Sequence, residues 1–186
     1  MDPISTIKIK KDSTFAMLLA AQARGWQLSY MELNDLSVID GTAMANMRSL
    51  TVADDPAAWF ELGDLTYEPL GDLDVILMRK DPPFDMEYIY ATYMLELAEQ
   101  QGVLVVNKPQ TLRDANEKLS TAWFPQCTSP TLVTRNPQQI LEFLQQQKDL
   151  ILKPLNGMGG ASIFRVAEGD DNTNVSLETL TEHETR

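Results

Sequence analysis

The sequence predicts an α/β fold, because strand-like and helix-like segments alternate along most of the chain. Residues 75–78 and 103–106 are short, continuous apolar runs of the kind that is buried in a parallel sheet. Between them, apolar side chains recur at helical spacing from Tyr90 to Leu97, and Gly102 is expected to end the helix. This strand–helix–strand unit predicts a mainly parallel sheet in the N-terminal part of the chain.

The segments before this unit are expected to form one helix and three strands. The helix should begin at Asp12 or Ser13, either of which can cap it, and should end at Gly25. Residues 26–31 are expected to form a strand, and residues 36–52 a β-hairpin.

Shorter elements are expected in the second half of the chain. The pattern predicts a helix over residues 112–122, a brief strand at 131–134, a helix that begins at Asn136-Pro137, and a strand at 150–153. This change of character, near residues 110–130, predicts a domain boundary there. Residues 168–186 are acidic and polar, with only scattered apolar side chains.

Composition limits the possible functions. The 186 residues include 15 Lys and Arg and 27 Asp and Glu, and the resulting net charge of −12 opposes binding to nucleic acid or to an anionic membrane. The sequence shows neither a membrane-spanning apolar run nor a signal peptide, so we expect a cytoplasmic protein. Cys127 and His183 are the only residues of their types, which excludes an internal disulfide and a four-ligand zinc site. We identify no nucleophile among the residues.

A glycine-rich loop joins two strand-like segments within residues 150–166. Gly157, Gly159 and Gly160 allow backbone N–H groups to approach an anion, and Lys153 adds a positive charge at the base of the loop. A P-loop or a dinucleotide site would be followed by a helix, whereas a strand is expected here. We therefore expect the loop to bind the phosphates of ATP, with a plain glycine-rich hairpin turn as the alternative.

A charged loop follows the apolar run at residues 75–78. Ligands of α/β sheets bind at the carboxyl ends of strands, and the planar fork of Arg79 suits a carboxylate. A solvated charged turn is the alternative. Lys118 would, by its spacing alone, be one more solvent-facing cation on a helix.

Taken together, five segments closely resemble the prokaryotic glutathione synthetase family. They are residues 77–96, 106–119, 131–135, 151–165 and 178–186. The most specific are RKDPPFD at 79–85 and KPLNGMGG at 153–160. The resemblance implies an N-terminal, parallel-sheet pre-ATP-grasp domain over residues 1–117, followed by the first part of an ATP-grasp domain over residues 118–186. The glycine hairpin alone would indicate only the wider ATP-grasp superfamily.

The resemblance also implies an activity. ATP would phosphorylate the cysteinyl carboxylate of γ-glutamylcysteine, and the amine of glycine would then attack the acyl phosphate to give glutathione, ADP and phosphate. Magnesium would assist, and the bacterial family forms a homotetramer. Two alternatives remain open at this point: another ATP-grasp carboxylate–amine ligase, and a non-catalytic nucleotide-binding or assembly module.

Family roles can be carried over to residues that match the motifs. Lys118 and Lys153 would hold the ATP phosphates, and Arg79, Lys80 and Asp81 would line the dipeptide site. The loop that covers the phosphates would be formed by Gly157, Met158, Gly159, Gly160, Ala161 and Ser162. The magnesium ligands would lie beyond Arg186, so no metal ligand and no catalytic residue is expected in this sequence.

The family pattern extends past this sequence at both ends. Members usually begin with a short strand before the Met-Asp-Pro that stands here at residues 1–3, and they continue past residue 186 into the magnesium-ligand segment. We therefore expect a chain truncated at both ends, inactive by itself, with apolar strand edges exposed.

Overall fold

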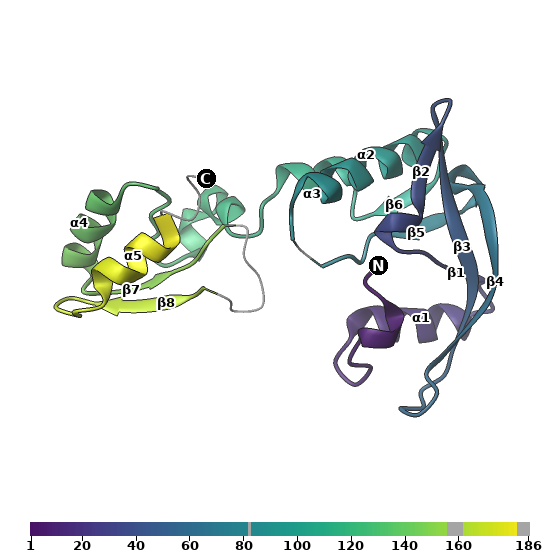
Figure 1. The fold of residues 1–186 in the computed structure, drawn as a ribbon, viewed down its shortest axis with the longest axis horizontal. Coiled ribbons are helices and arrows are strands. Elements are labelled where there is room, and N and C mark those ends of the chain that lie inside the picture. The colour runs from purple at the N-terminus through teal and green to yellow at the C-terminus, as the bar shows by residue number, and fades with distance from the viewer. Residues whose placement is uncertain (82, 156–161, 182–186) are drawn as a thin grey trace. The chain divides into compact units, whose positions relative to one another are not determined.

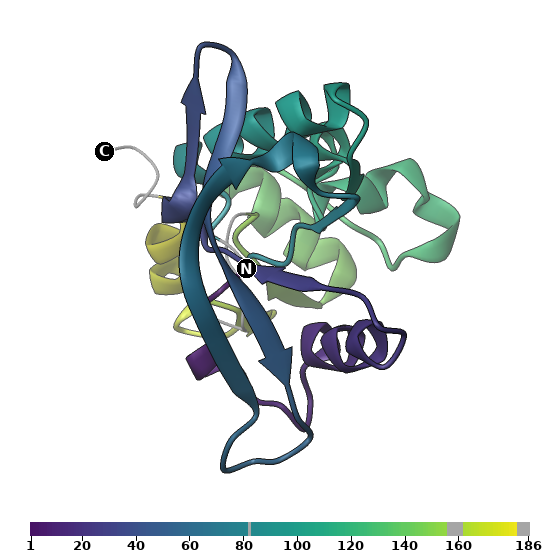
Figure 2. The ribbon, with the colours of Figure 1, turned by 90° about the vertical axis from the view of Figure 1, so that its right-hand side faces the viewer.

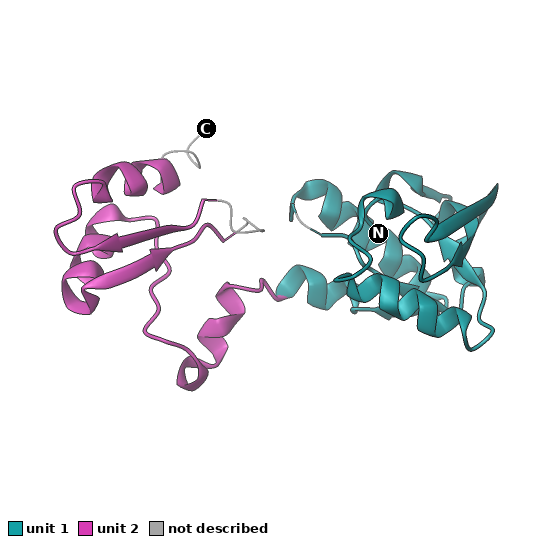
Figure 3. Cartoon of the chain, turned by 90° about the horizontal axis from the view of Figure 1, so that it is seen from below, with its two compact units in different colours: residues 1–114 teal, residues 115–186 magenta. Residues whose placement is uncertain are grey.

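The computed structural model describes residues 1–81, 83–155 and 162–181 (Figure 1). The chain divides into two compact units, Met1–Asp114 and Ala115–Arg186 (Figure 3). Unit 1 contains two sheets and unit 2 contains a β-hairpin with helices beside it.

The larger sheet of unit 1 is antiparallel and is built around the long strand β3 (Thr42–Val52). β1 (Leu28–Tyr30) and β2 (Leu36–Ile39) pair with successive parts of β3, while β4 (Phe60–Pro69) pairs with nearly its whole length (Figure 2). The predicted strand at 26–31 and the hairpin at 36–52 are confirmed.

β4 was not expected from the sequence, because Gly63, Asp64 and Pro69 weaken its strand pattern. The register shifts between Arg48 and Leu50, and a Cβ on Gly63 would lie 2.2 Å from the Ser49 Oγ. Glycine therefore allows the two strands to stay paired across this irregularity.

The second sheet of unit 1 confirms the predicted strand–helix–strand unit. β5 (Val75–Leu77) and β6 (Leu104–Val106) pair in parallel, and α2 (Met86–Gln100) connects them. The side chain of Asp85 accepts a hydrogen bond from the Tyr88 N–H and caps α2, and Gly102 follows the helix with a φ of 105°. Parallel pairing holds for this pair of strands, whereas the four-stranded sheet is antiparallel.

Helix α1 (Ser13–Gln22) also begins where the sequence predicts. Asp12 is its cap, since its Oδ1 accepts a hydrogen bond of 2.8 Å from the Phe15 N–H. Phe15 lies in a core cluster with Ile4 and Leu50, while Leu95 of α2 lies in a second cluster. The remaining helical segments of this unit are η1 (Ile4–Thr6), η2 (Leu33–Asp35), η3 (Leu70–Asp72) and α3 (Pro109–Asp114).

Unit 2 is organised around the hairpin of β7 (Asp149–Leu152) and β8 (Phe164–Ala167), with α4 (Pro137–Gln147) and α5 (Thr173–Thr181) beside it (Figure 1). Asn136 caps α4 through its side chain, as expected. Two short helical turns, η4 (Leu119–Trp123) and η5 (Pro125–Cys127), precede α4. α5 was not expected from the polar sequence after residue 168, but it buries Leu177.

The helix expected over residues 112–122 is not continuous, so this prediction was wrong. α3 ends at Asp114 and η4 begins at Leu119. The Asn116 side chain explains the break, because its Oδ1 accepts hydrogen bonds of 2.9 Å from the N–H groups of Lys118 and Leu119. Lys118 therefore lies at the start of a new helical turn and not within an α-helix.

The strand expected at residues 131–134 was also wrong. This segment pairs with no strand in the described part of the chain, and Leu132 and Val133 are exposed. Apolar, β-branched residues alone do not make a strand, because a strand also needs a neighbour for its backbone N–H and C=O groups.

Candidate functional site

The loop that contains Arg79 leaves the parallel sheet in a fixed direction. Pairing continues one residue past β5, because the Met78 N–H donates a 2.7 Å hydrogen bond to the Val106 carbonyl. Arg79 therefore follows a backbone position that is anchored to β6, at the carboxyl edge where α/β sheets place ligand sites.

Asp2 fixes the next residues of the same loop. Its Oδ1 lies 2.6 Å from the Lys80 Nζ, and its Oδ2 accepts a 2.7 Å hydrogen bond from the Asp81 N–H. Lys80 also donates a 2.6 Å hydrogen bond to the Asp81 carbonyl. The charge of Lys80 is thus engaged within the loop, and this residue is well placed to hold the loop's shape.

Asp2 is itself held by the buried segment that follows it. Ile4 is 2% exposed; its N–H donates to the Tyr30 hydroxyl at 3.1 Å, and its carbonyl accepts a 3.2 Å hydrogen bond from the Trp59 indole. Burial by itself would raise the pKa of the Asp2 carboxyl. The hydrogen bonds from Lys80 and the Asp81 N–H, together with the Lys80 charge, outweigh burial, so the pKa lies below its ordinary value of 3.8.

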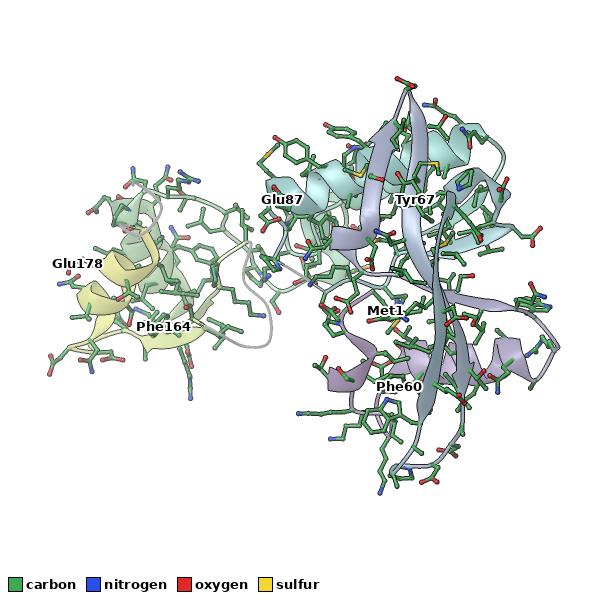
Figure 4. The ribbon with its side chains drawn as sticks, turned by 45° about the vertical axis from the view of Figure 1, so that its right-hand side comes forward. Met1, Phe60, Tyr67, Glu87, Phe164 and Glu178 are labelled. Carbon is green, nitrogen blue, oxygen red and sulfur yellow. The ribbon has the colours of Figure 1, made fainter. Side chains whose placement is uncertain are left out.

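Arg79 borders a hollow of about 530 Å³ in unit 1. The N-terminal segment at Met1, which Figure 4 labels, forms part of its lining. The charged residues that line it are Asp2, Lys8, Lys11, Asp12, Arg79 and Asp81. The guanidinium of Arg79 donates from Nε to the Thr14 Oγ1 at 2.9 Å and from Nη2 to the Ser13 Oγ at 3.0 Å. The structure thus brings Arg79 and Asp81 to one hollow.

In unit 2, the structure brings Lys118 to the base of the predicted phosphate loop. The Lys118 Nζ donates a 3.2 Å hydrogen bond to the Leu155 carbonyl, and the Asn116 side-chain amide donates to the same oxygen at 3.3 Å. The Lys118 Nζ also lies 3.0 Å from the Glu117 Oε1. Leu155 is two residues past Lys153, so two lysines that are distant in sequence belong to one region of the fold.

The predicted strand–loop–strand arrangement around Lys153 is confirmed. β7 and β8 are antiparallel, and Leu152 and Phe164 form their last pair before the loop. Lys153 is exposed directly after this pair. The residues Gly157, Met158, Gly159, Gly160 and Ala161 lie outside the described residues. The chain is described again from Ser162, which has a φ of 54°.

The described residues offer no assembled metal site and no membrane span. Within residues 1–81, 83–155 and 162–181, no three His, Cys, Asp or Glu side chains come together in a way that could hold a metal ion. In the same ranges, every helix is too short or too polar to cross a membrane. Cys127 is an exposed thiol.

Sequence reasoning missed the residues that position the site. Asp2 lies 79 residues before Asp81, and Thr14 lies 65 residues before Arg79. Local patterns explain other roles for this region, such as capping by Asp12, but they carry no signal for contacts across such separations. Asn116 was missed for a different reason, because its effect on the helix depends on side-chain geometry.

Comparison with family models shows to which protein family the chain belongs. Residues 1–113 match the model of the prokaryotic glutathione synthetase N-terminal domain, and residues 117–186 match the model of the prokaryotic glutathione synthetase ATP-grasp domain. The chain belongs to the prokaryotic glutathione synthetase family. These matches confirm the family that the sequence motifs indicated. They also confirm an α/β fold in which an N-terminal domain is followed by part of an ATP-grasp domain.

Individual relatives carry the family name. The glutathione synthetase of Shewanella oneidensis is 64% identical over 183 residues, which cover 98% of this chain and 58% of the relative. That of Pseudomonas putida is 64% identical over 181 residues, which cover 97% of this chain and 57% of the relative. That of Escherichia coli K12 is 62% identical over 186 residues, which cover 100% of this chain and 59% of the relative. The chain thus spans less than two thirds of the length of these glutathione synthetases.

A solved structure shares the fold. The ATP-grasp ligase PsnB, determined in complex with a minimal precursor, matches with a TM-score of 0.50 and 13% identity, over 94% of this chain and 58% of that chain. At this identity the match supports the fold alone.

The contacts of Asp2 should make the stability of the protein depend on pH. Asp2→Asn should lower the free energy of unfolding by up to about 1 kcal/mol near neutral pH, since it removes a partly exposed ion pair. Because the folded-state pKa of Asp2 lies below 3.8, its contribution is present above that pH and is lost as the pH falls further. Urea denaturation of both proteins over a range of pH should therefore give curves that converge in acid.

Asp54→Asn is the matched control, because Asp54 is exposed outside this loop. It should leave the stability profile unchanged. A constant difference between wild type and Asp2→Asn down to the lowest accessible pH would show that the ion pair does not carry the effect.

Proposed function

We propose that the protein to which these residues belong ligates glycine to γ-glutamylcysteine, with ATP converted to ADP and phosphate, and so makes glutathione. The observation that carries the proposal is the match to both domains of one enzyme family, together with 64% identity to a glutathione synthetase. The reaction would pass through an acyl phosphate on the cysteinyl carboxylate, which glycine's amine then attacks.

We assign the ATP phosphates to unit 2. The β7–β8 hairpin, the exposed Lys153 and the contact of Lys118 with Leu155 support this assignment, because two cations then belong to the region of the loop. Ser162 would contribute from the end of the loop. The roles of Gly157, Met158, Gly159, Gly160 and Ala161 rest on the sequence motif.

We assign the dipeptide to unit 1, with Arg79 as the carboxylate-binding residue. Arg79 lines the hollow together with Ser13 and Thr14, and the hydroxyl groups of these two residues are the partners of its guanidinium. Lys80 and Asp81 would shape the loop around the substrate. Phosphoryl transfer of this kind depends on positioning and on neutralising charge, so the chemistry requires no protein nucleophile.

The remaining assignments follow from the family. We propose a cytoplasmic homotetramer that acts on small molecules and uses Mg²⁺ to neutralise the ATP phosphates. No described residue is assigned to the metal ion, because no suitable cluster forms among them. We also propose that the ATP-grasp domain begins at residue 118.

A coupled assay tests the activity. Protein expressed from the complete coding frame that contains residues 1–186 should release phosphate from ATP and Mg²⁺ only when γ-glutamylcysteine and glycine are both present. Glutathione should form in equal amount. Efficient turnover with another acyl acceptor, and none with γ-glutamylcysteine, would instead identify a different ATP-grasp ligase.

Two lysine variants test the phosphate site. Lys118→Gln and Lys153→Gln should each weaken ATP binding by about tenfold to a hundredfold, because each removes a charged hydrogen-bond donor to phosphate. Calorimetric titration with a nonhydrolysable ATP analogue measures the change. Lys148→Gln is the matched control, since Lys148 pairs with Glu168 at the other end of the hairpin. A lysine variant that binds the analogue as tightly as this control would remove that lysine from the site.

A further inference from the structure

The hydrogen bonds of Arg79 reveal which edge of its guanidinium is left for a ligand. An arginine side chain has five N–H donors and can bind a carboxylate either along its Nε–Nη2 edge or at its Nη1–Nη2 end. Here Nε donates to Thr14 and Nη2 donates to Ser13, so the first edge is occupied. Nη1 makes no hydrogen bond to any described residue, and the Nη1–Nη2 end remains available.

The partners of Arg79 leave its charge uncompensated. Ser13 and Thr14 accept through neutral hydroxyl oxygens, and no described carboxylate forms an ion pair with Arg79. Three carboxylates line the same hollow. Asp12 caps α1, Asp2 binds Lys80, and Asp81 forms no ion pair with Arg79. A hydroxyl pair can therefore fix the direction of the guanidinium while its full positive charge stays available to an anion.

The backbone on both sides of Arg79 is also fixed. Met78 is bonded to β6, and the Asp81 N–H is bonded to Asp2. Thr14 is buried, so its hydroxyl is a rigid acceptor. With its backbone anchored and one edge of its side chain held, Arg79 has little freedom to turn away from the hollow.

We propose that Ser13 and Thr14 are positioning residues, which hold Arg79 so that its Nη1–Nη2 end binds a substrate carboxylate in the hollow of unit 1. The proposal rests on the proposed function for the identity of the ligand, a carboxylate of γ-glutamylcysteine. The positioning itself follows from the contacts of Arg79. Lys8 and Lys11 line the same hollow and add positive potential.

Steady-state kinetics of the protein from the complete coding frame test the role in substrate binding. Thr14→Val, which removes the hydroxyl and preserves the shape, should raise KM for γ-glutamylcysteine about tenfold, with kcat and KM for ATP nearly unchanged. Thr14→Ser should restore KM, and Ser13→Ala should act in the same direction as Thr14→Val. Thr66→Val is the control, because Thr66 lies on β4 with its hydroxyl directed to the Met47 carbonyl.

An NMR measurement tests the positioning independently of activity. The Arg79 Nε–H signal, assigned by its loss in Arg79→Lys, should exchange slowly with solvent in wild type and Thr14→Ser, and rapidly in Thr14→Val. Unchanged exchange in Thr14→Val would overturn the positioning role. Faster exchange with an unchanged KM would overturn the carboxylate contact. If wild type fails to use γ-glutamylcysteine, the proposed function fails, and the exchange rates still decide whether Thr14 positions Arg79.

Discussion

The candidate substrate site depends on the interactions of the Asp2 carboxylate. This carboxylate binds Lys80 and the backbone of Asp81 at once, and so it joins the start of the chain to a loop 79 residues away. The segment that carries Asp2 is held in place by the buried side chain of Ile4. The residue before Arg79 is bonded to β6. The backbone is therefore fixed on both sides of Arg79 by groups outside the loop.

Polar side chains in this region have separate tasks. Lys80 and Asp2 neutralise each other, and both form hydrogen bonds to the backbone of Asp81. Arg79 is held by hydroxyl groups, which leave its positive charge unneutralised. The charge of Arg79 can therefore act on an anion in the hollow. In a chain with a net charge of −12, local cations of this kind set the potential at an anion site.

The sequence was a good guide to structure where the cause is local. Asp12 and Asn136 cap helices because their side chains reach an N–H two or three residues away, and both starts were predicted. Asp85 caps α2 in the same way, although its role was not predicted. The strand–helix–strand unit and the β7–β8 hairpin also follow from short-range patterns. Motif resemblance in a few segments was enough to identify the family.

Elements that depend on distant partners were not predictable in this way. β4 forms because its backbone can pair with the long strand β3. Residues 131–134 have strand-like side chains, but they pair with no strand in the described part of the chain. The break before η4 depends on the Asn116 side chain. At the candidate site, Arg79 could be chosen from its motif, but Ser13 and Thr14 could not, because only the fold brings them to it.

We propose that unit 1 binds a substrate carboxylate through Arg79 and that unit 2 binds the ATP phosphates through Lys118 and Lys153. A crystal structure of the protein from the complete coding frame, with a nonhydrolysable ATP analogue and γ-glutamylcysteine bound, would test both assignments at once. We expect the triphosphate to lie against both lysines and a dipeptide carboxylate to lie on the Nη1–Nη2 end of Arg79. A triphosphate bound elsewhere, or a dipeptide that leaves Arg79 without a carboxylate, would contradict it.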